Sequence, residues 1–334
     1  MKKVLVVGAG GFAGGFICEE CLRRGWQVWA GVRETTSRRY LRDERLKFTV
    51  LDFDRPETLA EALRNSLGED GKWDYIIYNL GATKCLNFAD FNRINYLYLQ
   101  YFTEALKESG LVPEKLLYIS SLSAMGPCDE KGYAPYTEGM IPMANTRYGA
   151  SKLKAEMLLQ MDSIPYIIFR PTGIYGPRDK DYFLMLKTIS KGFDFSAGYK
   201  KQLLTFIYVE DLARAVFDAL EKAPVNQTYL ISEETAYSQK EFRKIAARSL
   251  GKKSIISLPL PLWIVKGVSS VAEKWGIARM KPSTLNRDKY NIMRQRNWDV
   301  DISKAKKDFG FNPRVSLEEG LNNAIEWYRK ENWL

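Results

Sequence analysis

The chain has 334 residues, of which 46% are hydrophobic and 13% aromatic, and this composition supports a large globular core. It contains no histidine, which excludes the commonest general base and the commonest zinc ligand, so acid–base chemistry must use Tyr, Lys, Asp or Glu. The net charge of +10 suits anionic ligands or an anionic membrane surface, but the basic residues are scattered and form no nucleic-acid motif, so we expect no nucleic-acid partner.

The amino-terminal half of the sequence predicts a regular alternation of strands and helices. Its first apolar run, residues 4–7, ends in glycines and is therefore typical of a strand and not of a signal peptide. A helix through Arg24 is expected next. The alternation predicts the α/β class, with a Rossmann doubly wound parallel sheet. Further strands are expected at residues 27–32, 47–51, 75–79, 115–120 and 166–169, and further helices at residues 91–109 and 148–161.

The carboxyl-terminal half follows a less regular pattern. From about residue 173, proline, glycine and aromatic residues divide the chain into short elements, with a returning sheet segment expected at residues 203–209 and a final helix at residues 317–330. We therefore expect a dinucleotide-binding Rossmann domain at residues 1–172, with returning segments at about residues 203–232. Residues 173–334 are expected to form most of a smaller, mixed substrate-binding lobe, interleaved with the first domain.

Glycines mark the turn after the first predicted strand. Gly8, Gly11 and Gly14 have a spacing that lets the backbone approach a pyrophosphate and places that group at a helix amino terminus. Gly8, Gly10 and Ala13 fit the other dinucleotide spacing equally well. A tight turn without a ligand is the alternative, but the position directly after a strand favours a dinucleotide site.

The end of the second predicted strand bears on which dinucleotide is bound. An NAD site usually has Asp or Glu here, whereas this chain has Arg33, followed by Ser37, Arg38 and Arg39. A guanidinium suits a 2′-phosphate, so NADP(H) is favoured over NAD(H); an ordinary surface role for Arg33 is the alternative. Asp52, after the third strand, is placed to reach the adenine amino group.

The segment Tyr148-Gly-Ala-Ser-Lys152 supplies a candidate proton-transfer site. Residues four apart lie on one face of a helix, so we expect the Lys152 ammonium beside the Tyr148 phenol, where it would lower the tyrosine pKa. A tyrosine with a lowered pKa is an acid or base usable near neutral pH. This spacing alone is more often found on a solvated helix face, and the glycine turn is what favours chemistry here.

The four cysteines form neither a disulfide framework nor a metal site. Cys18 and Cys21 fall in the middle of the first predicted helix, well past the helix start that would lower a thiol pKa, and Cys85 and Cys128 are irregularly spaced. We therefore expect packing thiols in a reducing compartment, no bound metal and a cytoplasmic location. No apolar run approaches the length of a membrane span.

Together these features resemble the extended short-chain dehydrogenase/reductase family, within the NAD(P)-dependent epimerase/dehydratase superfamily. The resemblance covers nearly the whole chain and keeps the family's order of motifs. These motifs are the glycine turn at residues 8–14, Asn79-Leu-Gly-Ala82, Asn95, Ile119-Ser-Ser-Leu-Ser123, the Tyr148/Lys152 pair, residues 170–178 (Arg-Pro-Thr-Gly-Ile-Tyr-Gly-Pro-Arg) and Tyr208-Val-Glu-Asp-Leu-Ala213.

The resemblance implies hydride transfer at nicotinamide C4. Tyr148 would exchange a proton with a substrate oxygen, and Lys152 would lower the tyrosine pKa and bind the nicotinamide ribose. Asn95 would support a proton-relay water. The cofactor-binding set that the resemblance and the motifs imply is Gly8, Gly11, Phe12, Gly14, Arg33, Arg38, Asp52, Phe53, Gly81, Ala82, Tyr148, Lys152, Pro171 and Gly173.

Ser121 is the fourth residue of the implied catalytic centre, where it would hydrogen-bond the reacting oxygen. It is chosen over Ser120 and Ser123 because similar family members place the glycine seen here at Gly126 five positions after the catalytic serine. Helix capping or loop hydrogen bonding is a serious alternative for Ser120 and Ser123, and a lesser one for Ser121.

Gly173 bears on the branch of the family. Nucleotide-sugar epimerases and dehydratases of this family usually carry an asparagine at this position to hold the nucleotide diphosphate, so a nucleotide-sugar substrate is less favoured. Residues 28–33 and 120–127 instead look like the dihydroflavonol reductase and 3β-hydroxysteroid dehydrogenase branch. That likeness implies a ketone or secondary alcohol on a bulky hydrophobic scaffold, sterol-like or a long-chain 3-keto lipid of the ketosphinganine kind.

The expected function is therefore an NADP(H)-dependent oxidoreductase acting on such a hydrophobic substrate. A nucleotide-sugar epimerase or dehydratase with tightly bound NAD(P) is the alternative. A third hypothesis is a redox sensor or scaffold that binds NADP(H) without turnover, but the set of Ser121, Tyr148 and Lys152 argues against it.

Two expectations concern surfaces. Residues 255–277 combine apolar and aromatic side chains with Lys266 and Lys274, and they would line a lipid pocket or rest on the anionic inner face of a membrane. A helix packed on the substrate lobe is an equal alternative. The resemblance also implies a homodimer formed through the helices at residues 91–109 and 148–161.

Overall fold

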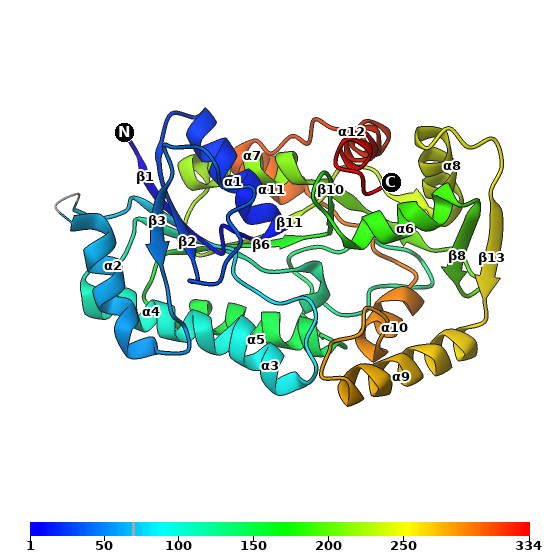
Figure 1. The fold of residues 1–334 in the computed structure, drawn as a ribbon, viewed down its shortest axis with the longest axis horizontal. Helices are drawn as coiled ribbons and strands as arrows, with labels where there is room; N and C mark the ends of the chain where they lie inside the picture. Colours follow the sequence, from blue (N-terminus) through cyan, green and yellow to red (C-terminus); the bar gives the residue numbers. More distant parts are fainter. Residues whose placement is uncertain (69–70) are drawn as a thin grey trace.

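The computed structural model describes residues 1–68 and 71–334, and its centre is a seven-stranded sheet in which every pairing is parallel (Figure 1). The strand order is β11-β6-β5-β4-β1-β2-β3, so the chain adds β2 and β3 on one side of β1 and then crosses to add β4 on the other side. The predicted α/β class and doubly wound sheet are confirmed. The strands are β1 (Lys3–Val7), β2 (Gln27–Val32), β3 (Lys47–Val50), β4 (Tyr75–Tyr78), β5 (Lys115–Ile119), β6 (Tyr166–Pro171) and β11 (Gln227–Ile231).

Two hydrophobic cores cover the two faces of this sheet. Successive side chains of a strand point to opposite faces, so Val4 and Val6 belong to one core and Leu5 and Val7 to the other. Figure 1 shows α1, α7 and α11 on one face and α2, α4 and α5 on the other. The bounds of these helices are α1 (Phe12–Arg23), α2 (Leu59–Leu67), α4 (Tyr98–Ser109), α5 (Arg147–Met161), α7 (Val209–Lys222) and α11 (Ser303–Phe309).

The helix expected at residues 91–109 begins earlier and is irregular. It starts as α3 (Phe88–Asn92), whose cap is the Asn87 side chain accepting the Asp90 amide, and continues through a π-helical turn (Arg93–Leu97) into α4. Such turns are frequent at functional sites because the extra residue redirects a side chain. Here the turn contains Asn95, which is fully buried.

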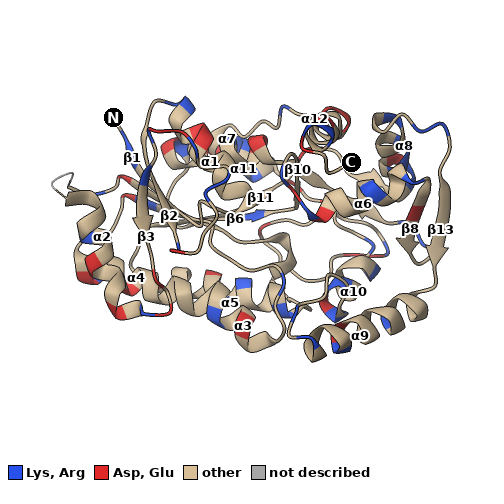
Figure 2. Ribbon diagram, in the orientation of Figure 1, with Lys and Arg blue, Asp and Glu red and all other residues tan. Residues whose placement is uncertain are grey.

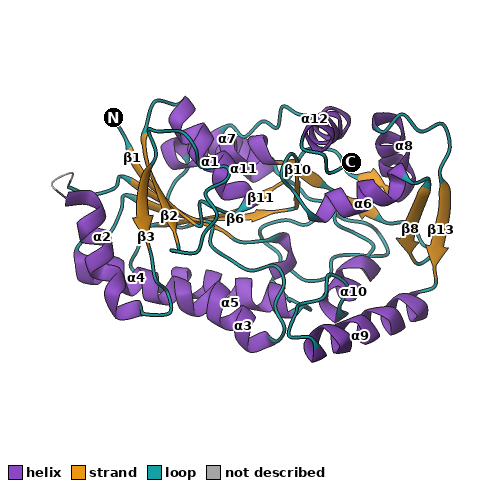
Figure 3. Ribbon diagram, in the orientation of Figure 1, coloured by secondary structure: helices purple, strands orange, loops and turns teal. Residues whose placement is uncertain are grey.

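A third core holds the carboxyl-terminal lobe together, which Figure 3 shows as helices around short strands. None of the helices in residues 1–68 and 71–334 is both long and apolar enough to cross a bilayer. The lobe elements are β7 (Gly173–Tyr175), α6 (Asp181–Ser190), β8 (Phe193–Ala197), β9 (Leu203–Leu204), β10 (Phe206–Tyr208), β12 (Tyr237–Ser238), α8 (Gln239–Ser249), β13 (Ile256–Leu260), α9 (Leu262–Ala278), α10 (Arg287–Arg294) and α12 (Leu317–Lys330).

The segment 203–209, expected as a returning sheet segment, does not join the main sheet. It is divided into β9, which pairs with β12, and β10, which pairs with β7. The backbone of Leu203 instead exchanges hydrogen bonds with Arg296 and Trp298, so its donor and acceptor are used within the lobe. The strand that returns to the sheet is β11, beside β6.

Candidate active site

A cavity of about 1310 Å³ lies between the carboxyl-terminal edge of the sheet and the lobe. Parallel strands that end at one edge bring their following loops together, and here the loops after β1, β4, β5 and β6 all contribute to the wall. The predicted site residues on this wall are Gly11, Phe12, Gly81, Ser121, Tyr148, Lys152, Pro171 and Gly173.

The glycine turn fits a dinucleotide. Gly8 has a φ of +84° and approaches the backbone of Leu80, so a Cβ there would lie 2.8 Å from the Leu80 nitrogen. A Cβ at Gly14 would overlap the Gly8 carbonyl oxygen, so Gly14 lets α1 pack closely on the turn. Gly11, the N-cap of α1, adds no capping side chain. The amino terminus of α1 therefore faces the cavity as a cradle for a pyrophosphate.

Tyr148 and Lys152 are positioned by the start of α5. The Thr146 side chain caps this helix by accepting the Gly149 amide at 2.9 Å, which places Tyr148 in the first turn and Lys152 one turn later. The Lys152 Nζ donates to the Ile119 carbonyl oxygen at 2.8 Å and lies 4.7 Å from the centre of the Tyr118 ring. Both predicted residues thus reach the cavity from one face of α5.

The electrostatics differ from expectation. Burial raises the pKa of Tyr148 to about 12, and a hydrogen bond with the Ser121 side chain opposes this rise. Burial also lowers the pKa of Lys152 to about 7, against the attraction of Glu156. The expected lowering of the Tyr148 pKa is therefore not found, because burial raises this pKa and the Lys152 Nζ is hydrogen-bonded to the Ile119 carbonyl oxygen. With a raised pKa, the Tyr148 phenol keeps its proton at neutral pH.

The neighbouring serines have separate roles. The Ser121 Oγ accepts the Ser123 amide at 3.2 Å, which caps the 3₁₀ turn Leu122–Ala124, and it hydrogen-bonds Tyr148. The Ser120 hydroxyl donates to the Glu156 carboxylate. Ser121 is therefore the serine that interacts with Tyr148, whereas Ser120 has a structural partner. The predicted role of Ser121 toward the reacting oxygen stays a prediction.

A buried ion pair supports the lysine. Glu156, one turn beyond Lys152, pairs with Arg170 of β6 at 2.6 Å, and the side chains are 0% and 5% exposed. Arg170 also contacts the Met125 sulfur at 2.8 Å. The pair ties α5 to the sheet behind Ser120 and Lys152. Glu156 was not among the residues predicted for the site, although an acid one turn after the lysine is a recognisable signal.

Asn95 holds the loop after β4. Its Oδ1 accepts the Ala82 amide at 2.7 Å, and its Nδ2 donates to the Ala82 carbonyl at 3.1 Å and to the Ser151 hydroxyl at 2.9 Å. A Cβ at Gly81 would lie 3.1 Å from both Asn95 Oδ1 and Lys152 Nζ, so only glycine fits there comfortably. Asn95 therefore acts on the site through the loop it positions, and its role in a proton relay stays a prediction.

The loop at residues 33–46 contains the predicted 2′-phosphate ligands. Ser37 and Arg39 line the cavity. The Arg38 guanidinium lies 4.3 Å over the Phe48 ring instead, and Arg33 is exposed to solvent. The structure thus brings Arg39 to the wall, whereas Arg33 and Arg38 are not among the residues that line it.

The residues after β3 are engaged within the protein. The Asp52 carboxylate accepts from Arg55 Nε at 2.7 Å, and this ion pair lowers the pKa of Asp52. The Phe53 ring is stacked on Tyr98, with 5.1 Å between the ring centres. The role of Asp52 in adenine binding and that of Phe53 in cofactor binding stay predictions.

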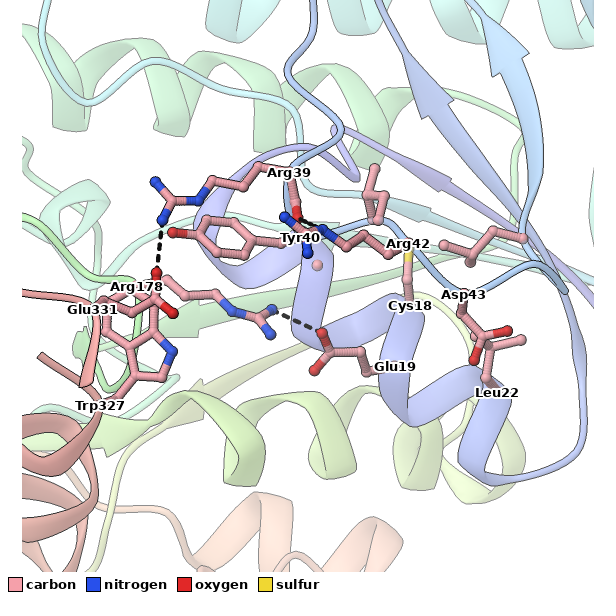
Figure 4. Close-up of a pocket in the computed structure, with 13 residues that line it drawn as sticks. Cys18, Glu19, Leu22, Arg39, Tyr40, Arg42, Asp43, Arg178, Trp327 and Glu331 are labelled. Atoms are coloured by element: carbon pink, nitrogen blue, oxygen red, sulfur yellow. Dashed lines mark hydrogen bonds and ion pairs between the residues drawn. The ribbon is translucent and has the colours of Figure 1, made fainter.

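A second cavity, of about 430 Å³, adjoins the same loop and lies between α1, this loop and α12 (Figure 4). Arg39 reaches Glu331 at 2.6 Å, and Arg178 reaches Glu19 at 2.8 Å with its guanidinium 4.7 Å over the Tyr40 ring. Arg39, Tyr40 and Arg178 line both cavities. The guanidiniums of Arg39 and Arg178 therefore mark the boundary between the two cavities, and no ligand role was predicted for Arg178.

The lobe supplies the far wall of the large cavity, and this wall is mainly apolar. None of its residues was predicted from the sequence, because they come from several elements and form no local motif. The apolar residues of this wall are Leu184, Met185, Ile189, Phe193, Phe195, Leu204, Phe206, Phe242, Leu285, Ile292, Met293 and Trp298.

Tyr182 explains the glycine at position 173. A Cβ on Gly173 would overlap the Tyr182 hydroxyl and lie 3.0 Å from its Cζ. Tyr182 is in the first turn of α6, where Asp179 accepts its amide at 2.7 Å, and its ring packs edge-on against Tyr175 and Phe206. The phenol therefore takes the volume that a side chain at residue 173 would need.

The start of α5 is also tied to the lobe. Arg147 pairs with Glu273 of α9 at 2.8 Å and with Asp288 of α10 at 3.2 Å. Asp288 in turn accepts the Tyr148 amide at 3.3 Å. The start of α5, which carries Tyr148, is therefore anchored to both lobe helices, and no sequence motif indicated this.

Comparisons with known proteins identify the family of the chain. The model of the NAD dependent epimerase/dehydratase family matches residues 4–232. The chain is 24% identical over 334 residues to the ceramide reductase of Caulobacter vibrioides, an alignment that covers 99% of this chain and 96% of the relative. It is also 24% identical over 343 residues to the UDP-glucose 4-epimerase of Vibrio cholerae, with 99% and 97% covered.

Solved structures show the same fold. The UDP-glucose 4-epimerase of Thermotoga maritima, crystallised with UDP-glucose, superposes with a TM-score of 0.77 at 20% identity over 99% of each chain. The family match extends from β1 to the end of β11 and includes the glycine turn and the Tyr148/Lys152 pair. The resemblance deduced from the motifs is confirmed, and the chain belongs to the NAD dependent epimerase/dehydratase family of NAD(P)-dependent enzymes.

Proposed function

We propose that the protein is an NADP(H)-dependent oxidoreductase that interconverts a ketone and a secondary alcohol on a bulky hydrophobic substrate. The substrate class is sterol-like or a long-chain 3-keto lipid of the ketosphinganine kind. The observation that carries the proposal is the division of the large cavity, which has Ser121, Tyr148 and Lys152 at the sheet and an apolar wall at the lobe. A polar head with a reacting carbonyl and an apolar body would match these two ends.

The protonation states support reduction. When bound, the reduced nicotinamide cofactor supplies the hydride that adds to the carbonyl carbon. Ser121 would hydrogen-bond the carbonyl oxygen, and Tyr148 would give that oxygen its phenolic proton as the carbon–oxygen π bond breaks. Because the pKa of Lys152 is about 7, Lys152 is poised to stabilise the resulting phenolate and to return a proton to it. Oxidation of the alcohol follows the same steps in reverse.

Residues on the wall fit the cofactor. Gly11 and Phe12 would hold the pyrophosphate at the amino terminus of α1. Arg33 and Arg39 supply the positive charge that favours a 2′-phosphate, so NADP(H) is expected to bind about tenfold or more tightly than NAD(H). Quenching of tryptophan fluorescence by each dinucleotide measures this difference. Equal affinities, or tighter binding of NADH, would refute the NADP(H) preference.

The alternative function is a nucleotide-sugar epimerase or dehydratase, which the similarity to the Vibrio cholerae UDP-glucose 4-epimerase favours. One observation favours the ketone substrate instead. Tyr182 takes the volume beside Gly173, the position at which the resemblance leads us to expect an asparagine that holds the diphosphate in a nucleotide-sugar enzyme. The chain is equally similar, at 24% identity over 99% of its length, to a protein named ceramide reductase.

Turnover assays decide between the two functions. The purified chain is supplied with NADPH and either steroid ketones and long-chain 3-keto lipids or UDP-glucose and dTDP-glucose. We expect loss of reduced-nicotinamide absorbance with apolar ketones only, and an alcohol product seen by mass spectrometry. Conversion of a nucleotide sugar without net cofactor oxidation, and no reaction with the ketones, would establish the alternative.

A further inference from the structure

The helix α9 exposes apolar side chains on its outer face, where a surface helix usually has polar ones. Of its 17 residues only Val265 and Ser269 are buried. The outward residues Trp263, Val271 and Trp275 are 75%, 68% and 62% exposed. Their spacing of eight and four places them on one side of the helix. Water-exposed tryptophans in such a row require an explanation, since exposed apolar patches mark contact surfaces.

The exposed apolar surface continues onto the β8–β13 pair. In this parallel pair Phe193 lies beside Ile256 and Phe195 beside Leu258, and alternate residues share a face. All four side chains are exposed. Figure 1 shows that β13 leads directly into α9 at this end of the lobe.

The charges around this surface are of one sign. Residues 252–281 contain six basic side chains and one acid, Glu273. Glu273 turns inward to pair with Arg147 and is only 12% exposed. Figure 2 shows basic residues along α9, where Lys266 and Lys274 are exposed. The outer face therefore presents tryptophans flanked by unopposed positive charge.

We propose that α9 and the β8–β13 pair form a docking surface for an anionic lipid bilayer. A helix with an apolar stripe along its axis and flanking lysines lies in the plane of a membrane interface, where tryptophan is also favoured. The positive flank complements anionic headgroups.

The docking surface adjoins the cavity. Phe193 and Phe195 of β8 both line the large cavity and are exposed at the surface. A bilayer seated on α9 and β8 would therefore place its acyl region at an apolar opening of the cavity. This route deepens the proposed function and rests on it, because it identifies the bilayer as the source of the hydrophobic substrate.

The direct test is sedimentation of the full chain with vesicles of phosphatidylcholine alone or mixed with phosphatidylglycerol, without cofactor or substrate. We expect binding to the mixed vesicles that weakens between about 0.1 M and about 1 M salt. The variant Trp263→Ser/Val271→Ser/Trp275→Ser should bind about tenfold or more weakly. The control Ile141→Ser/Met157→Ser/Met161→Ser changes three other exposed apolar residues and should bind like the wild type.

A second variant guards against misfolding. Lys266→Glu/Lys274→Glu leaves the apolar stripe intact and should also lose binding to phosphatidylglycerol vesicles. Three results would overturn the proposal: no binding by the wild type, equal binding by the α9 and control variants, or binding to phosphatidylcholine alone that is as strong as to the mixture. Light scattering provides a fourth such result. If the α9 variants, and not the control, had a lower molar mass than the wild type, this face would be an interface between copies of the chain.

The outcomes separate docking from catalysis. Vesicle binding without turnover of any ketone would refute the proposed function and leave docking intact. Turnover of a water-soluble short-chain ketone without vesicle binding would refute docking alone. The α9 variants should keep this soluble turnover and lose only the turnover of substrate presented in vesicles.

Discussion

The two walls of the large cavity are built in different ways. The sheet-side wall consists of short loops that each follow a strand, and it holds the polar groups Ser121, Tyr148 and Lys152. The lobe-side wall is drawn from helices and strands between Tyr182 and Trp298 and is mainly apolar. Under the proposed function, the sheet-side wall serves proton transfer and the lobe-side wall serves substrate selection. Substitutions in the two walls should therefore change different measured quantities.

Replacing Tyr148 with Phe tests the sheet-side wall most severely. Loss of the phenolic proton should lower kcat/KM for an apolar ketone by about 10²- to 10⁴-fold, whereas the dissociation constant for NADPH should hardly change. Steady-state kinetics and fluorescence titration measure the two quantities. The matched control is Tyr199→Phe, a tyrosine that is 73% exposed. Unaltered turnover by Tyr148→Phe would remove this residue from the chemistry.

The buried ion pair behind the same wall should contribute strongly to the free energy of unfolding of the protein. Arg170→Met leaves the Glu156 carboxylate buried without its partner, and we expect the free energy of unfolding to fall by about 3–5 kcal/mol. Urea unfolding measures this loss. The double variant Glu156→Leu/Arg170→Met removes both charges and should recover most of the stability. If the single and double variants were equally unstable, lost packing and not an unpaired charge would be the cause.

Glu233 lies where the two regions join, after β11. Burial raises its pKa from 4.5 to about 8, and its Oε1 is buried with no hydrogen-bond partner among the described residues. Because its pKa is raised, the Glu233 carboxyl stays protonated in the folded state at pH values where it ionises in the unfolded state. The free energy of unfolding is therefore not reduced by Glu233 below about pH 4.5, and it falls as the pH rises to about 8.

Glu233→Gln mimics the protonated form and should therefore remove this loss. We expect the variant to exceed the wild type at pH 8 by roughly 1–3 kcal/mol in free energy of unfolding, and to match it near pH 4.5. Urea unfolding across this range provides the measurement. Glu234→Gln, at an exposed neighbour, is the control. Parallel pH profiles for wild type and Glu233→Gln would show that Glu233 ionises normally.

The smallest effect is expected on the lobe-side wall. Gly173→Asn forces the Tyr182 phenol out of its position and should lower kcat/KM for an apolar ketone by about tenfold. Adding Tyr182→Ala should restore part of the rate by making room. Gly139→Asn is the control, since a Cβ at Gly139 meets nothing within 4 Å. An unchanged rate in Gly173→Asn would disconnect this contact from substrate choice.

Local pattern was sufficient where neighbouring residues decide the structure. Six of the seven sheet strands lie within two residues of their expected bounds, whereas β11 was not predicted as a strand, and the final helix Leu317–Lys330 has the predicted bounds. The choice of Ser121 over Ser120 also agrees with the hydrogen bonds, although its catalytic role stays a prediction. The segment 203–209 was misplaced, because its apolar pattern predicts a strand but cannot tell which partner the strand will find.

The sequence by itself determined the Rossmann fold, the glycine turn after β1 and the placement of Tyr148 and Lys152 one helical turn apart, because turns, strand alternation and helical spacing are set by residues close in the chain. Only the tertiary structure decided the sign of the Tyr148 pKa shift, the contact of Tyr182 with Gly173 and the apolar far wall. These depend on burial and on packing between distant segments, and no local spacing contains that information.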